Sequence, residues 1–268
     1  MRTLKDLERY TVHATDGDVG RVEDFLLDDE RWAIRYLVVN AGSFLDGRRV
    51  LVSPISLRDV EWSARSFHLS LTVEKVKNSP SIDTAKPVSR QHEWDYFSYY
   101  GYPFYWGGAG VWGTSAYPSL LGVASRSPGP TERSDQTGDV HLRSAHELRG
   151  YHVQGSDEAI GHVQDFIVDE ETWEVRYLVV DTSNWWFGKK VLVAPGWATR
   201  VSWPENKVYV DLSREVIKSA PEWKADVPID REYEARLHDH YGRPAYWGGA
   251  SSPLVTPPPA HDSSSNAV

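Results

Sequence analysis

The chain has 268 residues, a net charge of −9 at pH 7 and a pI near 5.6. This length corresponds to about two domains, and the acidic balance argues against a general nucleic-acid-binding surface, which needs clustered Lys and Arg. The absence of cysteine excludes disulfides and cysteine-ligated zinc. The first residues, MRTLKDLERY, do not resemble a secretory signal, and no apolar run approaches the roughly 18 residues of a membrane span. We therefore expect a cytoplasmic protein whose membrane contact is peripheral at most.

Six short strands are predicted in the first part of the chain. After a lead-in turn of helix at residues 2–10, Val12 begins the first strand. Residues 20–40 form two strands around an acidic turn, and three further strands follow at Val50–Val52, Val60–Trp62 and Phe67–Leu71. A short helical piece, Val73–Asn78, ends before Pro80. Six short strands with turn signals in about 80 residues predict a small antiparallel barrel.

The hairpin at residues 20–40 organises this unit. Its strands alternate apolar and polar positions, with the β-branched and aromatic residues that favour strands over helices. The second strand is apolar on both faces, which indicates a central position in the sheet. Trp32 and its counterpart Trp173 come just after the acidic turn of each copy and are predicted to close one end of a barrel core. We expect a buried core that contains Phe25, Tyr36, Val38, Val50 and Val52, with their counterparts Phe166, Tyr177, Val179, Val191 and Val193.

The whole unit occurs twice. The hairpin that starts at Gly20 recurs at Gly161, an offset of 161 − 20 = 141, and this offset holds without a gap from Arg2/Arg143 to Ala109/Ala250. The sequence thus predicts an all-β protein of two tandem small antiparallel β-barrels with short helical and aromatic appendages. The expected parts are 1–80 and 142–221 for the barrels, 81–109 and 222–250 for the aromatic appendages, 110–141 for a flexible linker, and 251–268 for a disordered tail.

The repeated unit resembles the PRC-barrel family. The resemblance depends on the GxVxDFxxD strands (Gly20–Asp28, Gly161–Asp169), the RYLVV strands (Arg35–Val39, Arg176–Val180) and the VLVxP strands (Val50–Pro54, Val191–Pro195). In that family, the barrel is the cytoplasmic domain of the photosynthetic reaction-centre H subunit and the C-terminal domain of a ribosome-maturation factor, and many other members look like assembly or adaptor modules. We expect neither the membrane helix of the former nor the N-terminal domain of the latter in this chain, so the resemblance implies a module whose partner is unknown.

Two groups of residues suggest chemistry. Asp24/Asp28 and Asp165/Asp169 are carboxylates four positions apart on one strand, which could serve a glycosidase-like reaction or hold a metal if they converged in a pocket. We favour strand-end and turn roles, because both copies keep them alike. His238-Asp239-His240 suggests a metal site, but neighbouring ligands on a helix point apart. We expect no catalytic residue, no metal and no cofactor.

The aromatic appendages are the best candidates for function. They share the motif YGxPxYWGGA at Tyr100–Ala109 and Tyr241–Ala250, and the candidate partner-binding residues are Tyr100, Tyr105, Trp106, Tyr241, Tyr246 and Trp247. Such a surface could dock a protein or a membrane, or it could pack back on its own barrel. For the basic pairs Arg48-Arg49 and Lys189-Lys190 we expect solvated loops.

The sequence therefore predicts a non-enzymatic protein-binding or assembly module. The alternatives are a membrane-associated role like that of the H subunit, an RNA- or ribosome-associated factor, which the acidic charge disfavours, and a metal-dependent hydrolase that uses the paired aspartates. A barrel of about 80 residues is only marginally stable alone. We therefore expect the two copies to pair face to face as an intramolecular pseudo-dimer, with the aromatic segments over or beside that contact.

Overall fold

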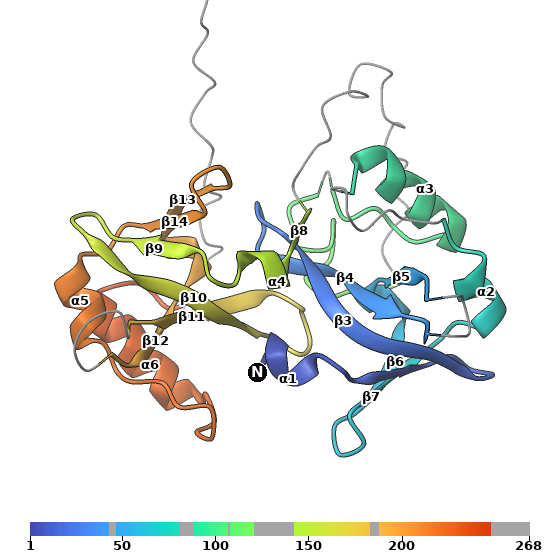
Figure 1. The fold of residues 1–268 in the computed structure, drawn as a ribbon, viewed down its shortest axis with the longest axis horizontal. Coiled ribbons are helices and arrows are strands. Elements are labelled where there is room, and N and C mark those ends of the chain that lie inside the picture. Colours follow the sequence, from blue (N-terminus) through green and yellow to red (C-terminus); the bar gives the residue numbers. More distant parts are fainter. Residues whose placement is uncertain (43–46, 81–87, 107, 121–141, 183–187, 248–268) are drawn as a thin grey trace, which may run out of the picture.

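In a computed structural model, the chain forms two similar units made mostly of strands, which confirms the predicted all-β class (Figure 1). The structure describes residues 1–268 except 43–46, 81–87, 107, 121–141, 183–187 and 248–268. Unit 1 contains β1 (Arg2–Thr3), α1 (Leu4–Leu7), β2 (Thr11–His13), β3 (Asp18–Asp28), β4 (Ala33–Asn40), β5 (Arg49–Val52), β6 (Leu57–Glu61), β7 (Ser66–Leu69), α2 (Val73–Lys77) and α3 (Arg90–Tyr100). Unit 2 contains β8 (Leu142–Ser144), α4 (Ala145–Leu148), β9 (His152–Gln154), β10 (Ala159–Val168), β11 (Val175–Asp181), β12 (Lys190–Val193), β13 (Ala198–Ser202), β14 (Lys207–Val210), α5 (Arg214–Ser219) and α6 (Arg231–Tyr241).

Both sheets have the same strand order. It is β5-β4-β3-β2-β7-β6 in unit 1 and β12-β11-β10-β9-β14-β13 in unit 2. The prediction of purely antiparallel sheets was wrong at one pair in each, because β7 and β14 lie parallel to β2 and β9. Within the described residues no pairing joins the two end strands of either sheet, so closed barrels stay a prediction. Register shifts in β3 and β10 mark bulges, which bend a strand and increase its twist.

The central hairpin forms as its sequence predicts. Phe25 of β3 lies opposite Leu37 of β4, and Asp28 closes the turn by accepting hydrogen bonds from the amides of Glu30 and Arg31 at 3.0 and 3.1 Å. Gly20 is required by close approach, since a Cβ there would lie 1.9 Å from the main-chain oxygen of Asn40. In unit 2, a Cβ at Gly161 would lie 2.0 Å from the main-chain oxygen of Asp181. The glycine that begins each hairpin therefore allows its two strands to approach closely.

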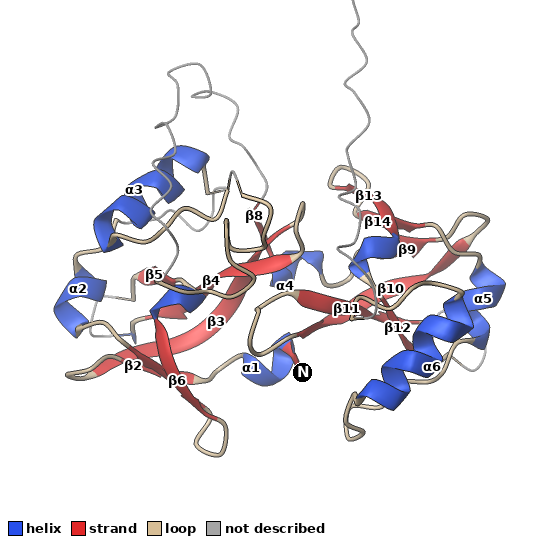
Figure 2. Cartoon of the chain, turned by 180° about the vertical axis from the view of Figure 1, so that it is seen from behind, coloured by secondary structure: helices blue, strands red, loops and turns tan. Residues whose placement is uncertain are grey.

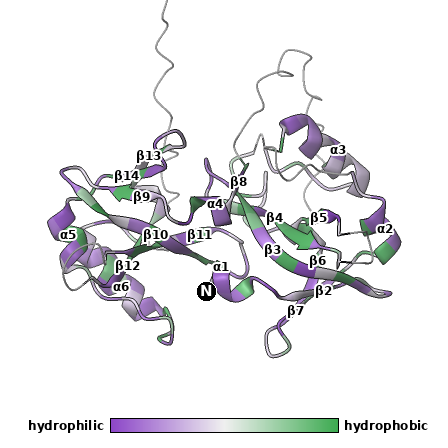
Figure 3. Ribbon diagram, viewed as in Figure 1, coloured by the Kyte–Doolittle hydropathy of each residue, from purple (hydrophilic) through white to green (hydrophobic). Residues whose placement is uncertain are grey.

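The predicted core is confirmed. All ten core residues named from the sequence are at most 4 % exposed. In β4 the first seven residues, Ala33–Val39, are all buried, which agrees with a central strand covered on both faces. Figure 3 shows the same division, with apolar residues concentrated on β4 and β5 and polar residues over much of α3 and α5.

The two units exchange their first strands. β1 pairs with β10 of unit 2, and β8 pairs with β3 of unit 1. The short helices that follow, α1 and α4, also contact the opposite unit, so that α1 and α4 lie in the centre of the molecule (Figure 1). Leu4 and Leu7 of α1 are at most 1 % exposed. Each lead-in segment therefore helps to complete the core of the other unit.

Trp173 shows the same exchange. It has a left-handed backbone (φ 59°) at the turn of the second hairpin, as Trp32 has at the first (φ 51°). Its ring lies 6.5 Å from that of Phe25 and 6.0 Å from that of Phe67, both in unit 1. The prediction that a tryptophan closes the end of a core is correct for Trp173, but the core that it covers includes residues of the other unit.

The segments between and after the units differ in part from expectation. The prediction that the aromatic segments lie over or beside the contact between the units is wrong for their helices. α3 and α6 lie at the outer flanks of the molecule (Figures 1 and 2), because each packs on the sheet of its own unit, as Tyr96 does through its hydrogen bond to Leu51. Residues 110–115, expected to belong to a flexible linker, form two backbone bridges, and Trp112 there is 4 % exposed and donates to the main-chain oxygen of Thr172 at 2.7 Å. Residues 121–141 of the expected linker and the expected tail, 251–268, lie outside the described residues.

We expect Phe25→Ala to lower the free energy of unfolding by about 3–5 kcal/mol, because it removes a fully buried ring and leaves a cavity. Urea unfolding of the full chain measures this change. Val227→Ala, at a side chain that is 50 % exposed, is the matched control and should change stability little. A loss below about 1 kcal/mol for Phe25→Ala would contradict the packing described above.

Candidate functional site

The site is built on two aromatic covers, which we define as residues 90–106 in unit 1 and 231–247 in unit 2. Each begins with a helix, α3 or α6. Ser89 and Asp230 cap the helix starts, and Gly101 (φ 70°) and Gly242 (φ 61°) end the helices in the left-handed conformation that glycine tolerates. Tyr96 illustrates how the cover is fastened, because its hydroxyl donates to the main-chain oxygen of Leu51 at 3.2 Å and accepts from the amide of Ser53 at 3.0 Å.

The structure places the six candidate partner-binding residues in two groups. Tyr100, Tyr105 and Tyr241 are 7, 3 and 6 % exposed, so their rings are buried against their own unit and offer no contact surface in this conformation. The other three residues are partly exposed, namely Trp106, Tyr246 and Trp247. The alternative noted from the sequence, that the appendages pack back on their own unit, therefore describes the three buried tyrosines.

A buried glutamate lies at the centre of the first cover. Glu93 is 2 % exposed, and its Oε1 accepts from the hydroxyls of Tyr36 at 3.2 Å and Tyr105 at 2.5 Å. Arg90 lies 3.0 Å from Oε2 and also donates to the Tyr105 hydroxyl at 3.1 Å. Burial raises the pKa of Glu93 to about 7, although Arg90 and the Tyr105 hydrogen bond oppose the rise. The carboxylate thus links the sheet, the helix and the aromatic loop.

The second cover repeats this arrangement. Glu234 is also 2 % exposed, and it accepts from Tyr177 at 2.8 Å and Tyr246 at 2.9 Å, while Arg231 lies 3.0 Å away. Burial and the neighbouring carboxylate raise the pKa of Tyr177 well above its ordinary value. Because every polar atom named here has a partner within the cluster, the arrangement is suited to fastening the cover.

Sequence reasoning missed these glutamates. A signal was present, because both copies carry Arg-x-x-Glu at the start of the helix and a tyrosine twelve positions after the glutamate. On a helix, positions three apart share a face, but only the fold shows that this face lies against Tyr36 or Tyr177.

The first aspartate of each repeated strand motif joins the two units. Asp24 of unit 1 accepts from the Ser144 hydroxyl at 2.5 Å and the His146 amide at 3.0 Å, both in the lead-in of unit 2. Asp165 of unit 2 accepts from the amide of Lys5 at 3.3 Å. Burial raises the pKa of Asp165, and the hydrogen bond from the Phe166 amide and the charge of Arg149 oppose that rise. These carboxylates hold the exchanged helices by their first turns.

The second aspartate of each motif serves its own hairpin. Asp28 closes the turn and lies 2.7 Å from Arg35, a guanidinium with no exposed surface that also stacks 3.8 Å from the centre of the Tyr105 ring. In unit 2, Asp169 lies 3.2 Å from Arg176, which lies 4.3 Å from the Tyr246 ring. All four aspartates therefore accept hydrogen bonds from backbone amides, and Asp28 and Asp169 also accept from arginine.

The two histidines of the 238–240 motif contact different groups. His238 is buried, with one ring nitrogen 3.2 Å from the Tyr177 hydroxyl and the other 3.0 Å from the main-chain oxygen of Pro244. His240 lies 2.8 Å from the main-chain oxygen of Val216. Among the described residues, no group of three or more His, Asp or Glu side chains is arranged to hold a metal ion.

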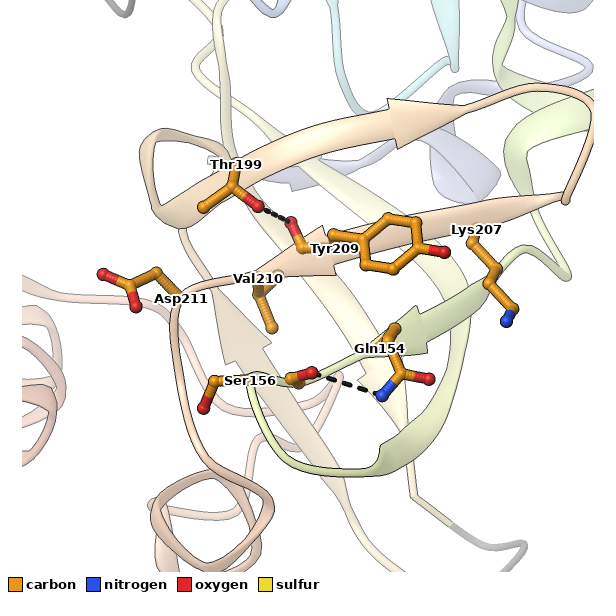
Figure 4. Close-up of a pocket in the computed structure, with 8 residues that line it drawn as sticks. Gln154, Ser156, Thr199, Lys207, Tyr209, Val210 and Asp211 are labelled. Atoms are coloured by element: carbon orange, nitrogen blue, oxygen red, sulfur yellow. Dashed lines mark hydrogen bonds between the residues drawn. The ribbon is translucent and has the colours of Figure 1, made fainter.

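An open groove lies along the parallel pair β9 and β14 of unit 2 (Figure 4). Lys207 and Asp211 lie at opposite ends of the view, and the two hydrogen bonds drawn, from Thr199 and from Gln154, both end on main-chain oxygens. The lining side chains thus present separate polar groups at a surface without converging on one point.

The comparisons with known proteins agree with this fold. Residues 141–217 match the model of the PRC-barrel domain family. This part of the chain is a PRC-barrel domain. The match does not extend to unit 1, so the family model alone shows one domain. A protein of Deinococcus radiodurans described as uncharacterized is 39 % identical over 83 residues, which are 31 % of this chain and 28 % of that protein. Within the described residues, no helix combines the length and apolar character that crossing a membrane requires.

We expect Asp24→Asn and Asp165→Asn to lower stability by about 1–3 kcal/mol each. At Asp24 an amide cannot accept at both oxygens as the carboxylate does. At Asp165 the change removes the negative charge that lies 3.5 Å from the Arg149 guanidinium. Chemical unfolding measures the loss. Asp226→Asn, at an exposed position, is the matched control. Unchanged stability in both variants would show that these carboxylates do not hold the lead-in segments.

For Glu93 we expect a dependence of stability on pH. Its pKa in the folded chain, about 7, is above its ordinary value of 4.5, so its contribution is fully present below about pH 4.5 and is lost as pH rises through about 7. The difference corresponds to about 3 kcal/mol. Unfolding of wild type and Glu93→Gln across this range should show a smaller loss with rising pH in the variant. The exposed control Glu74→Gln should keep the wild-type profile, and identical profiles for Glu93→Gln and wild type would contradict the assignment.

Proposed function

We propose that this chain is a non-enzymatic assembly module of two PRC-barrel-like units, paired within the chain as a pseudo-dimer, that binds a protein partner through the cover of unit 1. The proposal assigns no reaction to the repeated carboxylates. It is supported by the contacts that these carboxylates make. The aspartates hold turns and exchanged helices, and the glutamates fasten the covers.

One observation carries the choice of surface. Trp94 and Phe104 are partly exposed, and their rings stack at 6.5 Å between centres and 12° between planes. At the offset of 141, unit 2 has Ala235 and Ala245 at these positions. Unit 2 forms the same cover around the same glutamate cluster without these rings. The glutamate cluster therefore forms without these rings, although Phe104 also lies 6.0 Å from the ring of the buried Phe97. Large aromatic side chains dominate the energetics of protein interfaces.

The neighbouring side chains extend this surface. Phe104 lies 4.7 Å from Trp106 between ring centres, and the Arg90 guanidinium lies 4.7 Å from the centre of the Trp106 ring. Aromatic residues together with arginine are the composition enriched in interface cores. We infer an aromatic contact surface on unit 1, which includes Trp106 of the candidates named from the sequence.

The double variant Trp94→Ala/Phe104→Ala copies the residues of unit 2 and tests this proposal. Wild type and variant are used as baits in an extract of the source organism, and a protein retained only by the wild type is purified and titrated against both. We expect the variant to bind at least about tenfold more weakly, while a single cooperative melting transition shows that it remains folded. Val227→Ala should bind as the wild type does. Equal dissociation constants for wild type and double variant would overturn the proposed surface.

A further inference from the structure

The contact between the units follows a pseudo-two-fold axis. Thr3 pairs with Ile167 and Ser144 pairs with Leu26, and these pairs are equivalent because 144 − 141 = 3 and 167 − 141 = 26. The amide of Ile34 donates to the oxygen of Trp173 at 2.8 Å, and the equivalent amide of Val175 donates to the oxygen of Trp32 at 2.7 Å. A two-fold contact has this reciprocal form, in which each contact i–j is matched by j–i.

Residues on such an axis face their own counterparts. Arg149 and Glu8 are equivalent, since 149 − 141 = 8, and they form an ion pair across the contact. Their side chains are 10 and 22 % exposed. In a contact between two copies of unit 1, Glu8 would face Glu8, and between two copies of unit 2, Arg149 would face Arg149. At this position, only the pairing of unit 1 with unit 2 brings opposite charges together.

A second position on the axis has a related asymmetry. Ala33 forms a bridge with Glu174, its equivalent at 174 − 141 = 33. A contact between two copies of unit 2 would therefore oppose Glu174 to Glu174 as well. In a pair of unit 1 copies, Ala33 would face Ala33 and add no repulsion. Glu8 must therefore supply the repulsion that disfavours that pairing.

We propose that the Glu8–Arg149 pair determines pairing specificity, so that unit 1 joins unit 2 and not a second copy of itself. The lead-in strands and the aspartates that hold them are repeated, so this part of the contact is nearly the same for every combination of units. The hydrogen bond from Trp112 to the main-chain oxygen of Thr172 is supplied by unit 1, and it carries no charge that would oppose a pairing of two unit 1 copies. Like charges in a partly buried contact disfavour the wrong partner, while opposite charges favour the right one. The proposal concerns the contact between the units and does not depend on the partner surface of unit 1.

The test uses full-length chains. Glu8→Arg makes both axis positions positive, and Arg149→Glu makes both negative, so each variant repels itself while the two attract each other. One chain is isotopically labelled, both are unfolded and refolded together, and native mass spectrometry counts mixed two-chain species. We expect at least about ten times more mixed species than when labelled and unlabelled wild type are refolded together. The double variant Glu8→Arg/Arg149→Glu restores opposite charges and should behave as the wild type.

Two controls keep the test decisive. Arg200→Glu reverses one charge of an exposed ion pair with Glu205, and a mixture containing it should match the wild-type control. Arg149 also lies 3.5 Å from Asp165 of its own unit, so Arg149→Glu has a second cost. If that variant does not refold, Glu8→Arg is compared with Glu8→Gln, and only the former should place two positive charges together and be clearly less stable. Equal stabilities there, or no excess of mixed species in the main experiment, would overturn the proposal.

Discussion

The structure depends on the docking of each lead-in segment onto the long strand of the other unit. In unit 1 that strand, β3, also carries Phe25 of the core and Asp24, which accepts from the first turn of α4. The exchange is reciprocal, because α1 of unit 1 contacts β10 of unit 2 and its Leu4 and Leu7 are buried. Small domains bury too little apolar surface to be robust alone, and the exchange lets each unit add the other's apolar residues to its core.

The bulge beside each aspartate connects the strand motif to this contact. The register of β3 against β4 shifts between Val22 and Asp24, and that of β10 against β11 shifts between Val163 and Asp165. A bulge redirects side chains locally, and here the aspartate that follows it accepts from the lead-in of the other unit. The motif GxVxDFxxD thus combines a glycine for close approach, an aspartate for the other unit, an aromatic core residue and an aspartate for the turn.

The covers show how one scaffold can carry two surfaces. The Glu93 and Glu234 clusters are nearly identical, with two tyrosines and one arginine around each carboxylate. Because these contacts fasten both covers, the outer positions are free to differ, as Trp94 and Ala235 do. The same division applies at the contact between units, where repeated residues form the contact and the unlike pair Glu8 and Arg149 lies on its axis.

The sequence by itself determined the strand class, the repeat, the hairpin and its core, because alternation at period two and β-branched residues depend on local geometry. It also indicated structural roles for Asp24 and Asp28. Only the tertiary structure decided which unit Asp24 and Trp173 serve, that β7 runs parallel to β2, and that Glu93 is buried under two tyrosines. These features join residues far apart in the chain. Because the two units repeat the same residues, the sequence pattern is equally compatible with a contact inside one unit and with the equivalent contact between the two units.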